Sequence, residues 1–235
     1  MPASAIIVLG MHRSGTSSLA GMLEAGGLHL GTVNTAAAFN KKGNRENADV
    51  MRLNDAVLAN TGSDWRNPPA GAAIWNRDNL VERDAIAERL GERQPWGFKD
   101  PRALLTLDGW LPILADARFV ATFRHPKRVA RSLASRPGPL HVPIHEGLRL
   151  WQTYNERLLA FMETRPVELV DFDSPPDKYL ARVRAMCDGL GLDVAKAETF
   201  FAHELRVSDD GYEAEMSPQI IALHAQLKAR AATPI

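Results

Sequence analysis

The eight residues Gly10 to Ser17 form the segment of this sequence best suited to bind a phosphate. They read Gly-Met-His-Arg-Ser-Gly-Thr-Ser and follow the apolar run Ala5–Leu9, so a buried strand is predicted to lead into a glycine-rich turn and then a helix. In that setting, successive backbone NH groups and a helix N-terminus hold an anion. The alternative is an ordinary strand-to-helix turn with Arg13 on the surface.

The spacing of the two glycines matches the nucleotide phosphate-binding loop, G-x-x-x-x-G-K-[ST], with one departure. Thr16 stands where that loop has the lysine that contacts the β- and γ-phosphates, and a cation, Arg13, lies inside the loop instead. This departure disfavours a triphosphate bound with Mg²⁺. Arg13 is suited to oxygens on which negative charge develops during a group transfer.

A second phosphate site is predicted from Arg124 and Ser132. Arg124 ends an apolar strand, and Ser132 follows eight residues later, where two helical turns bring it back toward the same face. Arginine offers a planar fork that binds a phosphate bidentately, and the serine hydroxyl adds a donor. Arg136 either extends this site or lies in water at the end of the helix.

Both sites need a sheet to position them, because open α/β sheets bind ligands at the carboxyl ends of their strands. Apolar runs predict strands over Ala5–Leu9, Trp96–Phe98, Arg118–Phe123 and Val167–Phe172. Helical spacing of apolar residues predicts helices over Ser17–Ala25, Glu46–Leu58, Asn79–Arg93, Leu104–Leu114, Pro126–Ser135, Ile144–Thr164, Asp177–Leu190, Val194–His203 and Ser217–Ala231.

Strands that alternate with helices predict an α/β fold with a parallel sheet covered on both faces. We therefore expect a single domain over residues 1–235, a P-loop NTPase-like three-layer sandwich. A helical insertion at about residues 34–93 is expected to lie over the sheet and shape a cleft. The acidic stretch Ser208–Glu215 is expected to be a solvated loop.

Composition and charge exclude several classes of protein. The 28 basic and 28 acidic residues balance, so no overall field favours nucleic acid or an anionic membrane as a partner. Cys187 is the only cysteine, which excludes an internal disulfide and a multi-cysteine zinc site. No run reaches the roughly 18 to 20 apolar residues that span a bilayer, and no signal-like leader precedes the first strand, so we expect a cytoplasmic protein. Nothing in the sequence indicates an oligomeric state.

Three motifs, in this order, resemble those of the sulfotransferases that use 3'-phosphoadenosine 5'-phosphosulfate (PAPS). The loop Gly10–Ser17 is similar to their 5'-phosphosulfate motif, and Arg124-His-Pro-x5-Ser132 to their 3'-phosphate motif. Between them, Phe98-Lys-Asp-Pro-Arg102 is similar to a Lys-Asp-Pro element of tyrosylprotein and bacterial sulfotransferases. The resemblance spans roughly residues 5–175.

The resemblance implies PAPS as co-substrate and no metal. The contacts that it implies are Arg13, Ser14, Gly15, Thr16 and Ser17 for the 5'-phosphosulfate, and Arg124, Ser132 and Arg136 for the 3'-phosphate. Lys99 would serve the leaving group, unless it only pairs with Asp100 or another neighbour.

Transfer of a sulfuryl group to an alcohol needs a base within reach of the hydroxyl. The segment Gly43–Asn47 resembles the Gly-x-x-Glu-Asn region of bacterial sulfotransferases, which implies Glu46 as the base. Otherwise Glu46 is an acid in the first turn of a helix, where the macrodipole favours it. His12 is the second candidate for the base, unless it hydrogen bonds its own loop.

The Lys-x-Gly-x-x-Gly-Asp-Trp signature of aryl and steroid sulfotransferases is absent from the sequence. This disfavours a phenol or steroid acceptor. The resemblance to bacterial sulfotransferases implies a glycan hydroxyl as the first candidate, and then a small metabolite or a peptide tyrosine. Two alternatives stay open: a P-loop small-molecule kinase and a non-catalytic nucleotide-binding protein. A kinase should carry a lysine at position 16 and a magnesium-binding acid; Asp171 resembles such an acid, although sulfotransferases carry an acidic turn there without a metal role.

Overall fold

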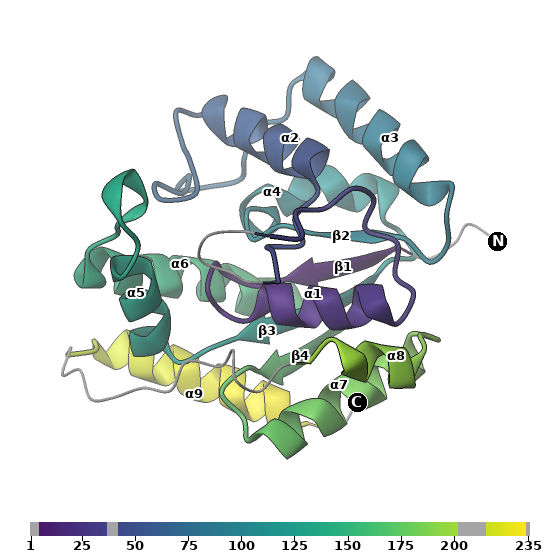
Figure 1. The fold of residues 1–235 in the computed structure, drawn as a ribbon. Coiled ribbons are helices and arrows are strands. Elements are labelled where there is room, and N and C mark those ends of the chain that lie inside the picture. Colours follow the sequence, from purple (N-terminus) through teal and green to yellow (C-terminus); the bar gives the residue numbers. More distant parts are fainter. Residues whose placement is uncertain (1–4, 37–41, 202–214, 234–235) are drawn as a thin grey trace.

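The computed structural model describes residues 5–36, 42–201 and 215–233, which form a parallel sheet between two layers of helices (Figure 1). The described strands are β1 (Ile6–Leu9), β2 (Gly97–Lys99), β3 (Arg118–Phe123) and β4 (Val167–Asp171). They pair in the order β2-β1-β3-β4, and every pairing is parallel. The first strand therefore lies inside the sheet, with a later strand on each side.

The sheet is buried on both faces, as expected when helices cover a parallel sheet. One layer holds α1 (Thr16–Ala25), α7 (Pro176–Gly189) and α8 (Val194–Thr199), and the other holds α4 (Ala103–Trp110), α6 (Ile144–Met162) and α9 (Pro218–Ala232). Side chains alternate along β1 accordingly. Ile6 and Val8 pack with the first layer, whereas Ile7 and Leu9 pack with the second.

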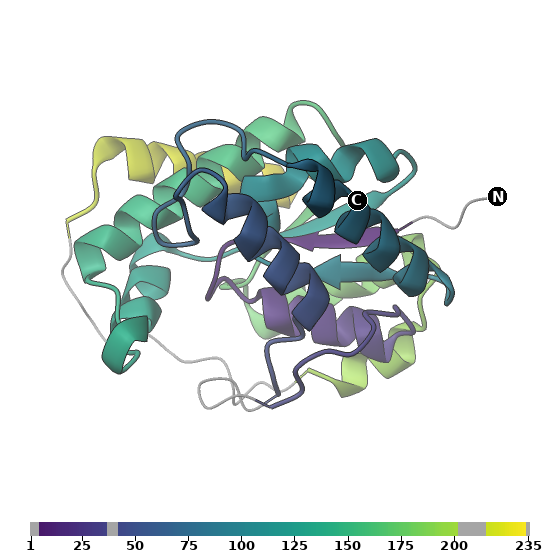
Figure 2. The same cartoon turned by 90° about the horizontal axis from the view of Figure 1, so that it is seen from above.

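Two helices lie outside α4, beyond the β2 edge of the sheet. Figures 1 and 2 show α2 (Ala48–Ala59) and α3 (Arg77–Gly91) side by side in this position. α2 buries Val50, Leu53 and Val57 in the same apolar cluster as α4. The helix α5 (Pro126–Ala134) follows β3 and packs along α6.

The fold class expected from the sequence is confirmed, and the helix ends differ for local reasons. The helix expected from Glu46 begins at Ala48, because the Asn47 side chain caps it. Its carboxamide oxygen accepts from the NH of Asp49 at 3.0 Å and of Val50 at 3.3 Å. Glu46 therefore belongs to the loop that precedes α2 and not to its first turn.

One more helix end departs from expectation, and another cannot be compared. The helix expected to reach Leu114 ends at Trp110 and continues only as a 3₁₀ turn, Leu111–Ile113, which contains a proline without an NH group. The expected helix end at His203 and the acidic stretch before Glu215 lie outside the described residues. None of the described helices is long and apolar enough to cross a membrane.

Candidate active site

The two predicted phosphate sites meet where the chain changes direction across the sheet. From β1 the chain crosses to β2 on one side, whereas from β3 it continues to β4 on the other. Open α/β sheets bind ligands at such a point, because the loops that leave the two strands diverge. Gly10 leaves β1, and Arg124 leaves β3, which is paired directly with β1.

The loop between β1 and α1 is held tightly against its neighbours. Gly10 has a φ of 135°, and a Cβ there would lie 2.4 Å from the carbonyl oxygen of Thr122. Gly15 has a φ of 88°, and a Cβ there would lie 2.2 Å from the ring of Phe172. The Thr122 hydroxyl also donates to the Ser14 carbonyl at 3.0 Å. Only glycine suits these two positions, so the loop conformation is fixed by the sheet beneath it.

α1 begins at Thr16, directly after this loop, and no side chain caps it. The first NH groups of a helix have no partner within the helix, and the helix dipole adds positive potential at this end. A buried Thr16 and a half-buried Ser17 stand in the first turn. The end of α1 therefore presents donors to the point where β1 and β3 end.

Two polar atoms of the loop are buried without a hydrogen-bond partner among the described residues. They are Oγ of Ser14 and Nε2 of His12. Leaving a buried polar group unsatisfied costs about 1–3 kcal/mol, so folded proteins keep few of them. The loop thus carries polar groups that a bound ligand can satisfy.

The imidazole of His12 lies among aromatic rings. Its centroid is 4.7 Å from that of Trp65 and 6.2 Å from that of Tyr154. Burial, and then the charges of Arg102 and Lys99, lower the pKa of His12 well below its ordinary value. The ring is therefore neutral at pH 7, with one nitrogen that donates and one that accepts a hydrogen bond.

Arg13 joins the loop to α5. Its backbone is left-handed, with a φ of 67°, and its Nε donates to Ser132 Oγ at 2.7 Å. Burial, and then the charges of Arg136 and Arg124, lower the pKa of Arg13 to about 10. It remains protonated at neutral pH, so three arginines share one region to which an anion is attracted.

A carboxylate that the sequence did not point to organises the second phosphate element. Asp173, in the turn after β4, accepts from Arg124 Nε at 3.2 Å and from Arg128 Nη1 at 2.7 Å. The backbone NH of His125 donates to its other oxygen at 2.8 Å. Burial acts to raise the pKa of Asp173, but the His125 NH and then the two arginines hold it below its ordinary value. Arg124 is thereby fixed through its Nε edge.

Lys99 and Glu46, the residues expected to act in the transfer, form a close ion pair at the end of β2. Lys99 Nζ lies 2.6 Å from Glu46 Oε1 and donates to the Asn44 carbonyl at 3.1 Å. The Lys99 side chain is 2% exposed and that of Glu46 is 13% exposed, so the pair is shielded but Glu46 reaches the surface. Left-handed backbone at Gly43 and Arg45 turns the chain toward this position.

The residues that follow Lys99 form a separate, buried network. Asp100 accepts from Arg102 Nη1 at 3.0 Å and from Asn54 Nδ2 at 2.9 Å. Arg102 Nε also donates to Asp55 Oδ1 at 2.6 Å. The Asn54 oxygen accepts from Trp110 Nε1 at 2.9 Å. This network ties β2 to α2 and α4, so Asp100 and Arg102 form a structural pair.

Asp171, at the end of β4, makes a local contact. Its Oδ1 accepts from the NH of Asp173 at 2.9 Å. Within residues 5–36, 42–201 and 215–233, no group of three or more His, Cys, Asp or Glu side chains could hold a metal ion.

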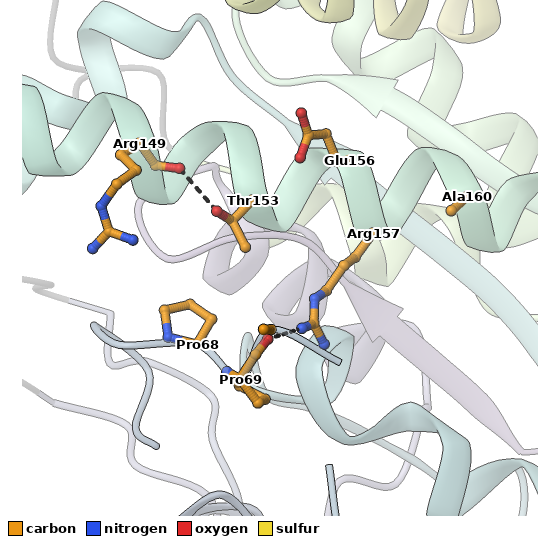
Figure 3. A pocket seen from close by; sticks show the side chains of 8 residues that line it. Pro68, Pro69, Arg149, Thr153, Glu156, Arg157 and Ala160 are labelled. Carbon is orange, nitrogen blue, oxygen red and sulfur yellow. Dashed lines mark hydrogen bonds between the residues drawn. The ribbon is translucent and has the colours of Figure 1, made fainter. Parts of the chain in front are cut away.

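A groove of about 530 Å³ lies between α6 and the loop before α3 (Figure 3). Its lining residues are Pro68, Pro69, Ala70, Arg149, Thr153, Glu156, Arg157 and Ala160. Arg157 fastens the loop to α6 by donating to the carbonyls of Pro69 and Gly71. Because the same loop carries Trp65, and Tyr154 of α6 donates to the Trp65 carbonyl at 2.9 Å, the groove and the His12 region share one wall.

Comparisons with known proteins were made for the whole chain. The sulfotransferase domain of the olefin synthase from Synechococcus PCC 7002 aligns with a TM-score of 0.60 at 18% sequence identity, covering 97% of this chain and 95% of that one. A sulfotransferase from Alicyclobacillus acidocaldarius aligns with a TM-score of 0.54 at 14% identity, covering 98% and 95%. A search of curated proteins found no significant match. At these identities the two structures establish a shared fold.

The family assignment has a separate basis. Residues 5–196 match the model of the sulfotransferase family. The matched range includes the loop after β1, the Lys99 motif and the segment from Arg124 to Ser132. It also includes all four described strands of the sheet. This chain belongs to the sulfotransferase family.

Proposed function

We propose that this chain transfers the sulfuryl group of PAPS to a hydroxyl acceptor. The observation that carries the proposal is the 2.7 Å hydrogen bond from Arg13 Nε to Ser132 Oγ. It joins two anion-binding elements that start from adjacent strands, and PAPS carries anionic groups at two positions of one nucleoside. A triphosphate needs only one such element, together with a lysine where this chain has Thr16.

The residues of the β1–α1 loop fit a 5'-phosphosulfate. The uncapped end of α1 supplies NH donors, and the buried Ser14 Oγ lacks a partner that an anionic oxygen can provide. Gly15, Thr16 and Ser17 form this end of α1, so the NH donors belong to their part of the backbone. Arg13 adds a positive charge beside those of Arg136 and Arg124.

The residues after β3 fit a 3'-phosphate. Arg124 is held by Asp173 through Nε. Ser132 reaches the same region through its contact with Arg13. A charge-assisted contact from a pre-oriented arginine is both stronger and more selective than one from a mobile lysine.

PAPS supplies an electrophilic sulfur joined to a phosphate leaving group. The acceptor oxygen forms the new bond to sulfur while the bond from sulfur to the phosphate oxygen breaks and leaves its electron pair on that oxygen. We assign Glu46 to take the hydroxyl proton and Lys99 to stabilise the charge left on the phosphate. The 2.6 Å hydrogen bond from Lys99 Nζ to Glu46 Oε1 holds the two side chains next to each other. His12, which is neutral, is the second candidate for the base.

The acceptor is proposed to be a glycan or a small metabolite with a free hydroxyl. Trp65 and His12 supply a ring surface and a hydrogen-bonding nitrogen, and the charge of Lys99 acts on His12. Such a surface suits a sugar ring or a compact alcohol. Most of the catalytic effect is expected from positioning and from stabilisation of charge on the leaving group.

The proposal is tested by ligand binding without and with Mg²⁺. The purified protein is titrated with adenosine 3',5'-bisphosphate, 5'-AMP and ATP while its thermal midpoint is followed, because a ligand that binds only the folded state raises the midpoint. We expect the bisphosphate to stabilise the protein without metal and far more than 5'-AMP does. Stabilisation by Mg-ATP alone would contradict the proposal and favour a kinase.

Turnover separates an enzyme from a protein that only binds the nucleotide. Release of adenosine 3',5'-bisphosphate from PAPS is measured with a panel of sugars, glycans and small alcohols. Wild type should release it in the presence of at least one acceptor class, and Glu46→Gln should not. Binding of the bisphosphate with no acceptor-dependent release would support the non-catalytic alternative.

A further inference from the structure

Arg136 is a half-buried cation without a carboxylate partner among the described residues. It follows the end of α5, and its Nε is buried without a hydrogen-bond partner. Within the described parts of the chain its side chain forms no ion pair. Burying part of a guanidinium without a partner is costly, and native structures rarely keep such a group without a use.

Two other largely buried arginines show that the fold places a carboxylate beside such a cation. Arg102 is matched by Asp100 and Asp55. Arg124 is matched by Asp173, which also binds the neighbouring Arg128. Arg136 lacks any equivalent carboxylate, so its anion is expected to come from outside the described structure.

The charge of Arg136 affects the pKa of His12 and of Arg13. It contributes to the lowered pKa of His12, and among the charges acting on Arg13 it is the largest cause of the lowered pKa there. For Arg136 itself, burial lowers the pKa and the charge of Glu46 opposes this. Arg136 therefore lies close to the proposed base and to the loop histidine.

The turn that follows Arg136 contacts the loop that carries Trp65. The 3₁₀ turn Gly138–Leu140 comes directly after it, and Arg66 Nη1 donates to the Pro139 carbonyl at 3.0 Å. Arg66 is next to Trp65, whose ring lies on His12. Arg136 is thus bordered by the loop that forms the wall of the acceptor region.

We propose that Arg136 binds an anionic group of the acceptor, so that the acceptor is an alcohol bearing a phosphate, sulfate or carboxylate near the hydroxyl that is modified. This rests on the proposed sulfuryl transfer and narrows its acceptor class. Arg13 and Lys99 serve the 5' end of the nucleotide, and Arg124 serves the 3' end. Arg136, which the sequence grouped with the 3'-phosphate residues, is assigned to the acceptor.

The experiment measures binding of inorganic sulfate to protein saturated with adenosine 3',5'-bisphosphate, by isothermal titration. The variants are Arg136→Gln, Arg136→Lys and Lys99→Met. Arg165→Gln is the matched control, because Arg165 is an exposed arginine that likewise follows the end of a helix. Affinity for the bisphosphate is measured first for each protein, and circular dichroism shows whether each variant is folded.

We expect Arg136→Gln to weaken sulfate binding about tenfold or more, the order expected for loss of a charge-assisted hydrogen bond. Arg136→Lys should restore part of it, and affinity for the bisphosphate should stay within about twofold of wild type, since neither variant touches the nucleotide in this assignment. Arg165→Gln should match wild type in both measurements.

Three outcomes would overturn the assignment. If Arg136→Gln weakens the bisphosphate as strongly as Arg124→Gln does, Arg136 belongs to the 3'-phosphate. If Lys99→Met abolishes sulfate binding and Arg136→Gln does not, the sulfate occupies the sulfuryl position. If wild type binds no sulfate, Arg136 holds no anion there. Failure of the proposed function is seen separately, as absence of bisphosphate binding to wild type.

Discussion

Lys99 and Arg102 lie three residues apart in one motif, yet their surroundings differ in kind. Lys99 has one carboxylate partner, Glu46, which comes from a loop and is 13% exposed. Arg102 has two, Asp100 and Asp55, and Asp100 is itself bound by Asn54. Burial acts to lower the pKa of Arg102, but its two carboxylates raise it above the ordinary value.

This difference in carboxylate partners distinguishes Lys99, which can exchange its partner for another anion, from Arg102, which cannot. A cation with a single, partly exposed partner can move its hydrogen bond to another anion at low cost. A cation with several partners loses several contacts if it moves, and breaking its buried pair, here the one with Asp100, is expensive. We infer that the motif combines a reactive half, Lys99 with Glu46, and a structural half, Asp100 with Arg102.

The largest effect is expected when the reactive half loses its base. Glu46→Gln keeps an oxygen that accepts from Lys99, so the fold and the affinity for adenosine 3',5'-bisphosphate should be retained. Turnover of PAPS should fall by about 100- to 10,000-fold, the range for loss of a general base. Glu88→Gln, at an exposed position of α3, is the control. Unchanged turnover would move the base role to another residue, His12 first.

In the structural half, the same kind of change should affect stability and not turnover. Asp100→Asn removes one of the two charges opposite Arg102 and should lower the free energy of unfolding by about 3 kcal/mol, as for other broken buried pairs. Urea unfolding measures this. Asp49→Asn is the control, because Asp49 pairs with Arg52 and Arg89 at the surface, where such pairs contribute under about 1 kcal/mol. A folded, stable Asp100→Asn with low turnover would contradict the division.

Arg124 lies between the two cases, since its described carboxylate partner, Asp173, also pairs with Arg128. Arg124→Gln should weaken binding of adenosine 3',5'-bisphosphate about 10- to 100-fold, because it removes charge-assisted hydrogen bonds, and should leave 5'-AMP nearly unchanged. Isothermal titration with both nucleotides measures this. Arg118→Gln, at the opposite end of β3, is the control. Equal weakening of both nucleotides would remove Arg124 from the 3'-phosphate.

Local patterns made the sheet, the loop after β1 and most helices predictable, because apolar periodicity and glycine spacing act over a few residues. The contacts that decide roles connect distant parts of the chain. Asp173 meets Arg124 across 49 residues and Arg102 meets Asp55 across 47. Both acids were visible in the sequence, but only the folded order of strands and helices shows which cation each one neutralises. One local feature, the start of α2, was predicted wrongly. The helix begins at Ala48 and not at Glu46, since Asn47 is a stronger capping residue than Glu46.

The smallest expected effect, and the one that depends on pH, concerns Asp173. Its pKa in the folded protein lies below the ordinary value, so its contribution to stability is present above the pKa of the unfolded state, about 3.9, and is lost as pH falls through the folded pKa. Asp173→Asn should therefore lower the free energy of unfolding by about 1 kcal/mol at pH 7, as for a hydrogen-bonded charged group.

The difference between wild type and Asp173→Asn should stay constant from pH 7 to about pH 5 and shrink below about pH 4, where the unfolded carboxyl takes up its proton. Urea unfolding at each pH measures it. A difference that grows as pH falls would mean that Asp173 is protonated in the folded protein. In that case Asp173 would not neutralise Arg124, and Arg124 would belong with Lys99 as a cation whose partner can be replaced.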